Sequence, residues 1–203
     1  TPLTLSRVNR PEIEIVDGNS LALGFDINAS NVTIRNLAIY GFGNGSNSDG
    51  DANIRIGNNQ TGTLIESCII GTLATSFTDP GAGTRSVGDN IRAVGADNGI
   101  VRNNLIGYSN GKGIELNSSA NGWLIENNEF RGNGISTPNL DGIDIENGSS
   151  STTVRGNLIT QNWACGIDTY FSNGSNLIEN NTIDQNGFTT SGGAIETMGL
   201  RIY

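Results

Sequence analysis

The sequence predicts an all-β solenoid in which short parallel strands stack in register. Three observations support this fold class: a six-residue phrase recurs along the chain, the charge of its second residue alternates between copies, and no window carries apolar residues at helical spacing. The composition agrees, because only 35% of the 203 residues are hydrophobic and 29 are glycine. A narrow stack needs fewer apolar residues than a round globule does.

The recurring phrase begins with an aliphatic residue, continues with a charged one and ends on a second apolar residue. Its copies lie 24 to 36 residues apart and start at Ile34, Ile65, Val101, Ile125, Val154 and Ile178. Apolar and polar residues alternate within each copy, and clusters of Gly, Asn and Ser flank it, as is typical of short strands with one buried face. One supersecondary unit therefore repeats, with loops of variable length.

The second residue of the phrase alternates strictly between arginine and glutamate. The six residues are Arg35, Glu66, Arg102, Glu126, Arg155 and Glu179. Parallel coils in register place each of these charges between two opposite ones, whereas antiparallel hairpins would place unlike positions opposite each other. We interpret the alternation as evidence of parallel stacking.

Asparagine recurs three residues after the leading aliphatic, at Asn104, Asn128, Asn157 and Asn181, where the first two copies have Leu37 and Cys68. Stacked asparagines can form an amide ladder along the axis, which satisfies polar groups at a bend inside the wall. We predict such a ladder here.

A second phrase follows the first in each repeat and predicts a further strand. It begins at Ile54, Ile91, Ile114, Ile143, Ile167 and Ile195. Its outward residues form a row of Arg55, Arg92, Glu115, Asp144, Asp168 and Glu196, and the next outward row is Gly57, Val94, Asn117, Glu146, Tyr170 and Met198. The last four residues of the first row are predicted to align as an acidic row, at steps of roughly 4.8 Å.

The loops and ends of the chain constrain its organisation. The longest interruptions, 43–53 and 71–89, lie between the first and second phrases, so both should project from one corner of the solenoid. We predict that residues 1–30 form one looser coil. The sequence shows no amphipathic helix that could cap either end of the solenoid. We therefore expect residues 1–203 to form one domain that is a segment of a longer protein or a subunit that stacks end to end.

Charge and composition exclude several classes of partner. The net charge is -9, so a phosphate backbone is repelled and nucleic acid is not expected as a partner. No stretch approaches the roughly 20 apolar residues that membrane insertion requires.

Cys68 and Cys165 fall about three layers apart, too far for a disulfide, and are predicted to be buried free thiols.

The phrases at 31–37, 113–116 and 178–183 resemble the coil repeat of the right-handed parallel β-helix, which pectate-lyase-like proteins share with repeat domains of secreted bacterial surface proteins. The resemblance covers residues 12–203. It implies a single-stranded right-handed parallel β-helix of about six to seven coils, at an extracellular or cell-surface location. It does not select an activity, because this architecture includes lyases, hydrolases, epimerases, adhesins and inert stalks.

The acidic row allows two kinds of catalysis. Glycoside hydrolysis needs an acid and a carboxylate about 5 to 9.5 Å apart, which adjacent or alternate layers of Glu115, Asp144 and Asp168 supply. Elimination from a uronate needs a base and a cation for the substrate carboxylate. Arg92, beside Glu115, provides that cation, and Lys112 lies near the turn.

The sequence could accommodate calcium as a cofactor. The ion would either assist catalysis or bind where no catalysis takes place. Candidate ligands are Asp49 and Asp51 in one loop and Glu115, Asp144, Asp168 and Glu196 in the acidic row. The loop resembles the start of an EF-hand but departs from that motif at Ile54 and Gln60. Alternatively, the acidic row is a solvated face that keeps the stack soluble.

These observations favour an extracellular structural or adhesive β-helix module that binds calcium, a polysaccharide or a cell-surface glycan. The main alternative is a polysaccharide-active enzyme (lyase, epimerase or hydrolase) with Glu115, Asp144, Asp168 and Arg92 as catalytic residues. A third alternative is a fibre subunit that associates with itself through its open ends.

Overall fold

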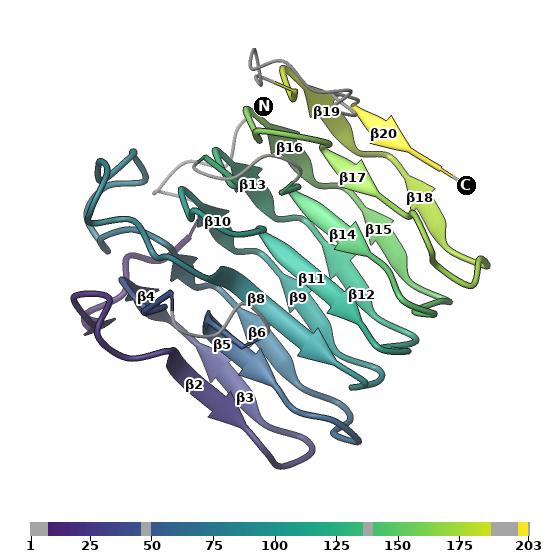
Figure 1. Ribbon diagram of the computed structural model, residues 1–203, viewed down its shortest axis with the longest axis horizontal. Coiled ribbons are helices and arrows are strands. Elements are labelled where there is room, and N and C mark those ends of the chain that lie inside the picture. Colours follow the sequence, from purple (N-terminus) through teal and green to yellow (C-terminus); the bar gives the residue numbers. More distant parts are fainter. Residues whose placement is uncertain (1–7, 46–49, 136–139, 188–198, 203) are drawn as a thin grey trace.

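The computed structural model describes residues 8–45, 50–135, 140–187 and 199–202. Within these ranges the chain winds into three parallel sheets, A, B and C, and forms no helix (Figure 1). Each coil passes through sheet B, then sheet C, then sheet A, and enters sheet B again one coil further on. The predicted parallel β-helix of six to seven coils is confirmed, because the three sheets contain seven, seven and six strands.

Every strand pairs in parallel with its counterparts in the coils before and after it. Sheet A contains β1 (Ile13–Val16), β4 (Leu37–Tyr40), β7 (Ile69–Ile70), β10 (Leu105–Gly107), β13 (Glu129–Arg131), β16 (Leu158–Thr160) and β19 (Thr182–Asp184). Sheet B contains β2 (Leu23–Ile27), β5 (Ala52–Ile56), β8 (Asp89–Val94), β11 (Ile114–Asn117), β14 (Ile143–Ile145), β17 (Ile167–Asp168) and β20 (Leu200–Arg201). Sheet C contains β3 (Thr33–Arg35), β6 (Leu64–Glu66), β9 (Ile100–Arg102), β12 (Leu124–Glu126), β15 (Thr153–Arg155) and β18 (Leu177–Glu179).

The recurring first phrase supplies both sheet C and sheet A, with a sharp corner between them. The residue at that corner adopts a left-handed backbone conformation in every coil, with φ between 54° and 65° at Asn36, Ser67, Asn103, Asn127, Gly156 and Asn180. Asparagine and glycine tolerate this conformation better than other residues do. The local sequence therefore turns the chain at the same point of each coil.

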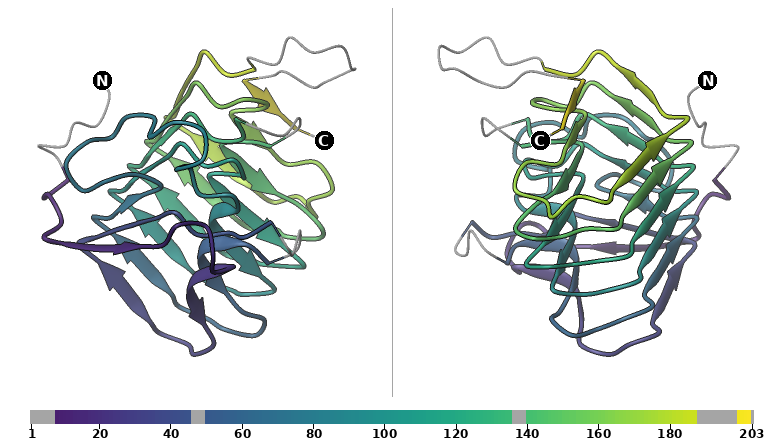
Figure 2. Two further views of the ribbon diagram at one scale, coloured as in Figure 1. Left: turned by 60° about the vertical axis from the view of Figure 1, so that its left-hand side comes forward. Right: turned by 90° about the vertical axis from the view of Figure 1, so that its right-hand side faces the viewer.

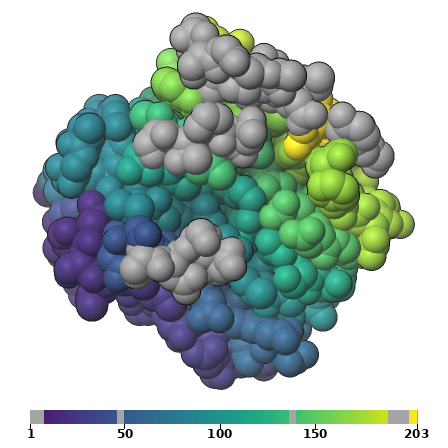
Figure 3. Space-filling model, in the orientation of Figure 1, coloured from purple at the N-terminus to yellow at the C-terminus, as the bar shows by residue number. Residues whose placement is uncertain are grey.

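Like residues stack on like residues along the inside of the solenoid. Ile54, Ile91, Ile114, Ile143 and Ile167 form one such column from sheet B, and all five are fully buried. Since successive coils stack on one another, the colours in Figures 2 and 3 follow the sequence in order along the stack. The core is therefore a set of continuous columns rather than a central cluster.

The alternating charges of the first phrase form one column on sheet C, as the sequence predicts. Arg35 pairs with Glu66, Glu66 with Arg102, Arg102 with Glu126, Glu126 with Arg155 and Arg155 with Glu179. Side-chain bridges of 2.8 Å join Arg102 Nη2 to Glu66 Oε2 and Arg155 Nη2 to Glu126 Oε2. The charge column therefore confirms the register.

The predicted asparagine ladder is also present. The side-chain nitrogen of Asn104 donates to Asn128 at 3.0 Å, Asn128 donates to Asn157 at 3.1 Å, and Asn157 donates to Asn181 at 2.9 Å. In each of these three pairs the accepting Oδ1 atom also accepts the backbone N–H of the donating asparagine. The ladder thus satisfies the polar groups of the corner between sheets C and A.

A second ladder follows the corner between sheets A and B, and the sequence analysis did not identify it. It runs from Asn53 through Asn90, Asn133 and Asn162 to Asn186, with donor–acceptor distances of 2.7 to 2.9 Å. The last three members each lie three residues after the inward apolar residue of a sheet A strand, and this spacing could have revealed them.

Both long loops connect sheet A to sheet B, so they project from the same corner, as predicted. Residues 41–51 join β4 to β5, with 46–49 outside the described residues, and residues 71–88 join β7 to β8. Shorter connections at this corner precede β11 and β14. Cys68 and Cys165 are buried and form no disulfide, as the sequence predicts.

Candidate functional site

The outward residues of sheet B form one row along the solenoid. The row consists of Asp26, Arg55, Arg92, Glu115, Asp144, Asp168 and Arg201. The structure therefore brings Arg92, Glu115, Asp144 and Asp168 together in the predicted order. An arginine adjoins the three acids at each end.

The predicted end of the row is wrong, because Arg201 rather than Glu196 lies beside Asp168. The last sheet B strand is β20, whereas the sequence analysis placed it at residues 195–197. Arg201 bonds to the Asp168 carboxylate through both Nε and Nη2. This pairing favours the observed register, since a glutamate at the same position would face a like charge. Glu196 and Asp49, two of the predicted calcium ligands, lie outside the described residues.

The acidic row is not a solvated face. The side chains of Glu115, Asp144 and Asp168 are only 4 to 6% exposed. Each of them is paired with a basic side chain contributed by another coil or by the connection that precedes its strand. The alternative interpretation of the acidic row as a solvated face is therefore wrong, because the chain compensates these charges internally.

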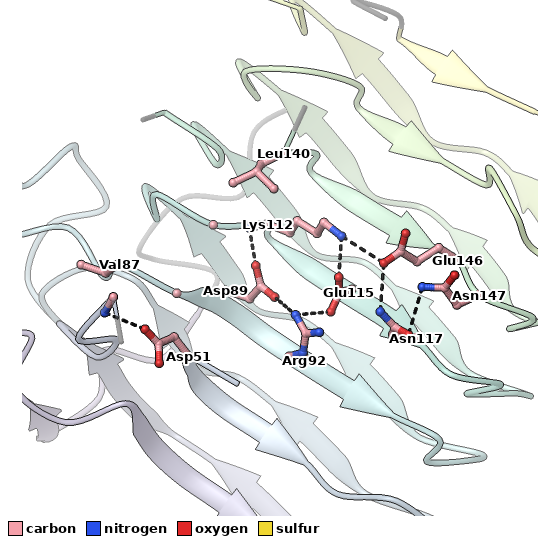
Figure 4. A pocket seen from close by; sticks show the side chains of 13 residues that line it. Asp51, Val87, Asp89, Arg92, Lys112, Glu115, Asn117, Leu140, Glu146 and Asn147 are labelled. Carbon is pink, nitrogen blue, oxygen red and sulfur yellow. Dashed lines mark hydrogen bonds and ion pairs between the residues drawn. The ribbon is translucent and has the colours of Figure 1, made fainter. Parts of the chain in front are cut away.

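Lys112 is the centre of this compensation. Its Nζ lies 2.5 Å from Glu115 Oε1 and 3.4 Å from Glu146 Oε1 (Figure 4). The same atom lies 2.5 Å from Asp144 Oδ2. The residue directly precedes Gly113 and β11, so the connection between sheets A and B directs its side chain over the acids. The sequence analysis noted Lys112 near the turn but did not predict these contacts.

Arg92 extends the network towards the preceding coil. Its Nη1 lies 2.5 Å from Glu115 Oε2 and 3.2 Å from Asp89 Oδ2. The other oxygen of Asp89 accepts the backbone N–H of Lys112 at 2.7 Å. Glu115 is therefore held between two cations, and Asp89 ties the arginine to the lysine connection.

Burial and charge shift the proton affinities of these groups in different directions. Burial disfavours the ammonium of Lys112, but four surrounding carboxylates, Asp144 foremost, raise its pKa above the ordinary value. Burial acts to raise the pKa of Glu115, yet Lys112 and Arg92 hold it below the usual range. Burial and then Glu115 raise the pKa of Asp89 to about 6. Burial also raises the pKa of Glu146, despite Lys112 and with a contribution from Glu115.

These residues line a cleft of about 420 Å³ at the corner where sheet A connects to sheet B. Asp89, Arg92, Lys112, Glu115, Asn117 and Glu146 form its charged and polar wall, while Val87 and Leu140 lie towards its other side (Figure 4). Asn117 donates to Glu146 at 2.9 Å and accepts from Asn147 at 3.2 Å. The cleft therefore presents cations, carboxylates and amides within one space.

Comparison with known proteins identifies the architecture. Residues 83–200 match the family described as "Right handed beta helix region". The chain belongs to this family. Among solved structures, the β-helix is similar to the Dettilon tailspike protein, with 20% identity and a TM-score of 0.49 over 70% of this chain. The match spans 32% of the tailspike chain, and no curated protein matches.

The family match includes the cleft walls from β8 to β14, so the β-helix repeat itself builds most of the site. The described residues contain no helix long and apolar enough to cross a membrane.

The β-helix gathers three acids as a metal site would, and two of them, Glu115 and Glu146, line the cleft. One carboxylate oxygen each of Glu115, Asp144 and Glu146 lie within 4.8 Å of one another. Among the described residues, however, it is the ammonium of Lys112 that lies between these carboxylates. Asp51, the other predicted ligand in this region, lines the same cleft and accepts the Gly45 N–H at 2.8 Å. The lysine therefore takes the place that calcium would need at the three acids.

Asp168 lies in a neighbouring cluster that does not line the cleft. Its carboxylate, that of Asp141 and the Cys165 sulfur lie within 4.8 Å of one another. Burial and then Asp168 raise the pKa of Asp141 to about 7. Asp168 thus continues the row next to Asp144 but lies outside the cleft, and its partner is Arg201.

Sequence reasoning missed two contributors to these clusters, Asp89 and Asp141. Both lie two residues before the inward isoleucine of a sheet B strand, as Lys112 does. Asp89, Lys112 and Asp141 thus place an ionisable residue at the same position in three consecutive coils. That recurrence is the signal that could have identified these three residues as a column of their own.

Proposed function

We propose that this β-helix is an extracellular or cell-surface module that binds a saccharide in the cleft over sheet B. The observation that supports the proposal most strongly is the juxtaposition of charged donors, carboxylates and amides in one cleft. Sugar hydroxyls both donate and accept hydrogen bonds, so they match such a wall better than an apolar ligand does. The volume of about 420 Å³ is within the usual range for small ligands.

Pre-organisation also supports binding. Asn117 is fixed from both sides, by Glu146 and by Asn147, so its amide loses little freedom when a ligand docks. Lys112 and Arg92 lock the carboxylates beneath it. Val87 and Leu140 supply apolar surface for the carbon face of a sugar ring.

Calorimetric titration with a panel of neutral, amino and acidic oligosaccharides tests the proposal. At least one panel member should bind, and Asn117→Ala should weaken it about fivefold to tenfold, as loss of a hydrogen bond implies. Asn121→Ala is the matched control, because this amide belongs to the same coil but does not line the cleft. The proposal fails if no saccharide binds, or if both variants bind as the wild type does.

A second candidate is glycoside hydrolysis, favoured by one observation in the cleft. Adjacent Glu115 and Glu146 have pKa values displaced in opposite directions, the first lowered and the second raised. Such a divergence is the arrangement expected of a carboxylate and a general acid. Elimination is less well supported, because Arg92 and Lys112 are engaged by the protein's own carboxylates rather than free for a uronate.

Product analysis after incubation with the same panel tests hydrolysis. If the reaction occurs, Glu146→Gln should lower its rate by about 10²- to 10⁴-fold, as loss of a general acid does. Glu126→Gln, on sheet C and remote from the cleft, should retain the wild-type rate. Binding without any released product would exclude this candidate and leave the binding proposal intact.

A further inference from the structure

The cleft over sheet B contains more acids than bases. The described residues that line it include four carboxyl groups and two basic groups: Asp51, Asp89, Glu115 and Glu146 against Arg92 and Lys112. At pH 7 the carboxyl of Asp89, with a pKa of about 6, is mostly ionised. Burial raises the pKa of Glu146, but even with this residue neutral three carboxylates face two cations. The cleft therefore keeps an excess of negative charge.

Both cations of the cleft are engaged by the protein itself. Lys112 Nζ lies 2.5 Å from oxygens of Glu115 and Asp144, and Arg92 Nη1 lies 2.5 Å from Glu115 and 3.2 Å from Asp89. The lysine and arginine side chains are only 11% and 12% exposed. An anionic group of a ligand would therefore compete with several carboxylates for each cation, and the field of the cleft would repel it.

Asp51 is the acid of the cleft that has no cation beside it. It lines the cleft (Figure 4), and among the described residues no basic side chain forms an ion pair with it. Its Oδ2 accepts the Gly45 N–H at 2.8 Å, whereas its Oδ1 has no hydrogen-bond partner although the residue is only 8% exposed. The carbonyl of Asp51 accepts the Asp89 N–H at 3.0 Å, so two acids stand in neighbouring coils. A buried carboxylate oxygen without a partner is unfavourable, and an ammonium group satisfies it strongly.

We infer that the saccharide bound in the cleft is an amino sugar with a free amino group, whose ammonium pairs with Asp51. This inference rests on the proposed binding function and selects one class of saccharide within it. An ammonium donates up to three hydrogen bonds and carries the charge that the cleft lacks. An N-acetylated sugar of the same ring structure has no such charge, and an acidic sugar has the wrong one.

Calorimetric titration at pH 7 with a glucosamine oligosaccharide and its N-acetylated counterpart tests the inference. The wild type should bind the amine about tenfold more tightly, as a hydrogen bond to a charged group implies. Asp51→Asn should remove most of this preference, because asparagine keeps the shape and an oxygen for the Gly45 N–H but loses the charge. Asp97→Asn is the matched control and should retain the preference. Asp97 also accepts a backbone N–H, from Asn121 at 2.8 Å, and does not line the cleft.

Circular dichroism checks that each variant is folded, and Asp89→Asn is the second variant, with the same expected loss of preference, if Asp51→Asn does not fold. Tighter binding of the acetylated, a neutral or an acidic saccharide would overturn the inference and leave the proposed binding function intact. So would a preference for the amine that survives removal of the carboxylate. Absence of binding by every saccharide would overturn both.

Discussion

Replacement of Lys112 by methionine is expected to lower the free energy of unfolding by about 3 to 5 kcal/mol at pH 7. Methionine keeps much of the length of the side chain but removes the charge that holds Glu115 and Asp144 at 2.5 Å. Arg92 still pairs with Glu115, but Asp144 loses its basic partner. Urea unfolding followed by circular dichroism measures the loss.

The loss should grow as the pH rises from 5 to 8. Burial raises the pKa of Asp144 well above its ordinary value, and Lys112 is the largest influence that lowers it. Without the lysine this pKa rises further, so the folded variant retains its proton over a wider range. Stability falls with rising pH wherever the folded state binds more protons than the unfolded state, so the variant is penalised most at the higher pH.

Arg155→Met is the matched control for the loss of a basic residue. Arg155 also bridges a glutamate in the neighbouring coil, at 2.8 Å, but its side chain is 47% exposed. Exposed bridges contribute at most about 1 kcal/mol. Equal losses of unfolding free energy in Lys112→Met and Arg155→Met would contradict a central role for Lys112.

Millimolar calcium should partly restore the stability of Lys112→Met and leave that of the wild type unchanged. In the variant the three carboxylates of Glu115, Asp144 and Glu146 are available to a cation.

Asn128→Ala is expected to cost roughly 3 to 5 kcal/mol, on the order of 10 °C in melting temperature. The Asn128 side chain takes part in four hydrogen bonds. Its Oδ1 accepts from the backbone and the side chain of Asn104, and its Nδ2 donates to Val101 O and Asn157 Oδ1. All these groups lie in the interior, so truncation leaves several of them without partners.

Thermal unfolding of Asn128→Ala and Asn58→Ala provides the comparison. Asn58 is exposed on the turn after β5, so its truncation should change stability by no more than about 0.5 kcal/mol. If Asn128→Ala melts within a degree or two of the wild type, the ladder does not hold the coils in register.

The architecture was predictable because its determinants repeat. Strict alternation of Arg102, Glu126 and Arg155 has meaning only when coils are parallel and in register, and the structure has that register. The asparagine ladder was predictable for the same reason, since one residue type recurs at one position of the phrase. The same residue pattern in several copies identifies a strand and its register, whereas the pattern of one short strand alone is ambiguous.

The charge state of the candidate site was harder to predict. A row such as Glu115, Asp144 and Asp168 looks like an open acidic surface when only one column is considered. Lys112, which neutralises Glu115 and Asp144, belongs to the connection before β11. Arg201, the partner of Asp168, lies in β20, which follows a longer connection than β17 does. Loops carry no period from which such contacts could be read.

The charge column of sheet C repeats only after two coils. Removal of one coil would bring Arg102 against Arg155, two cations, whereas removal of two coils would bring Arg102 against Glu179 and preserve attraction throughout. Internal duplications and deletions in such a gene should therefore be tolerated best in even numbers of turns. Length variants that differ by an odd number should carry a compensating charge exchange at the joint.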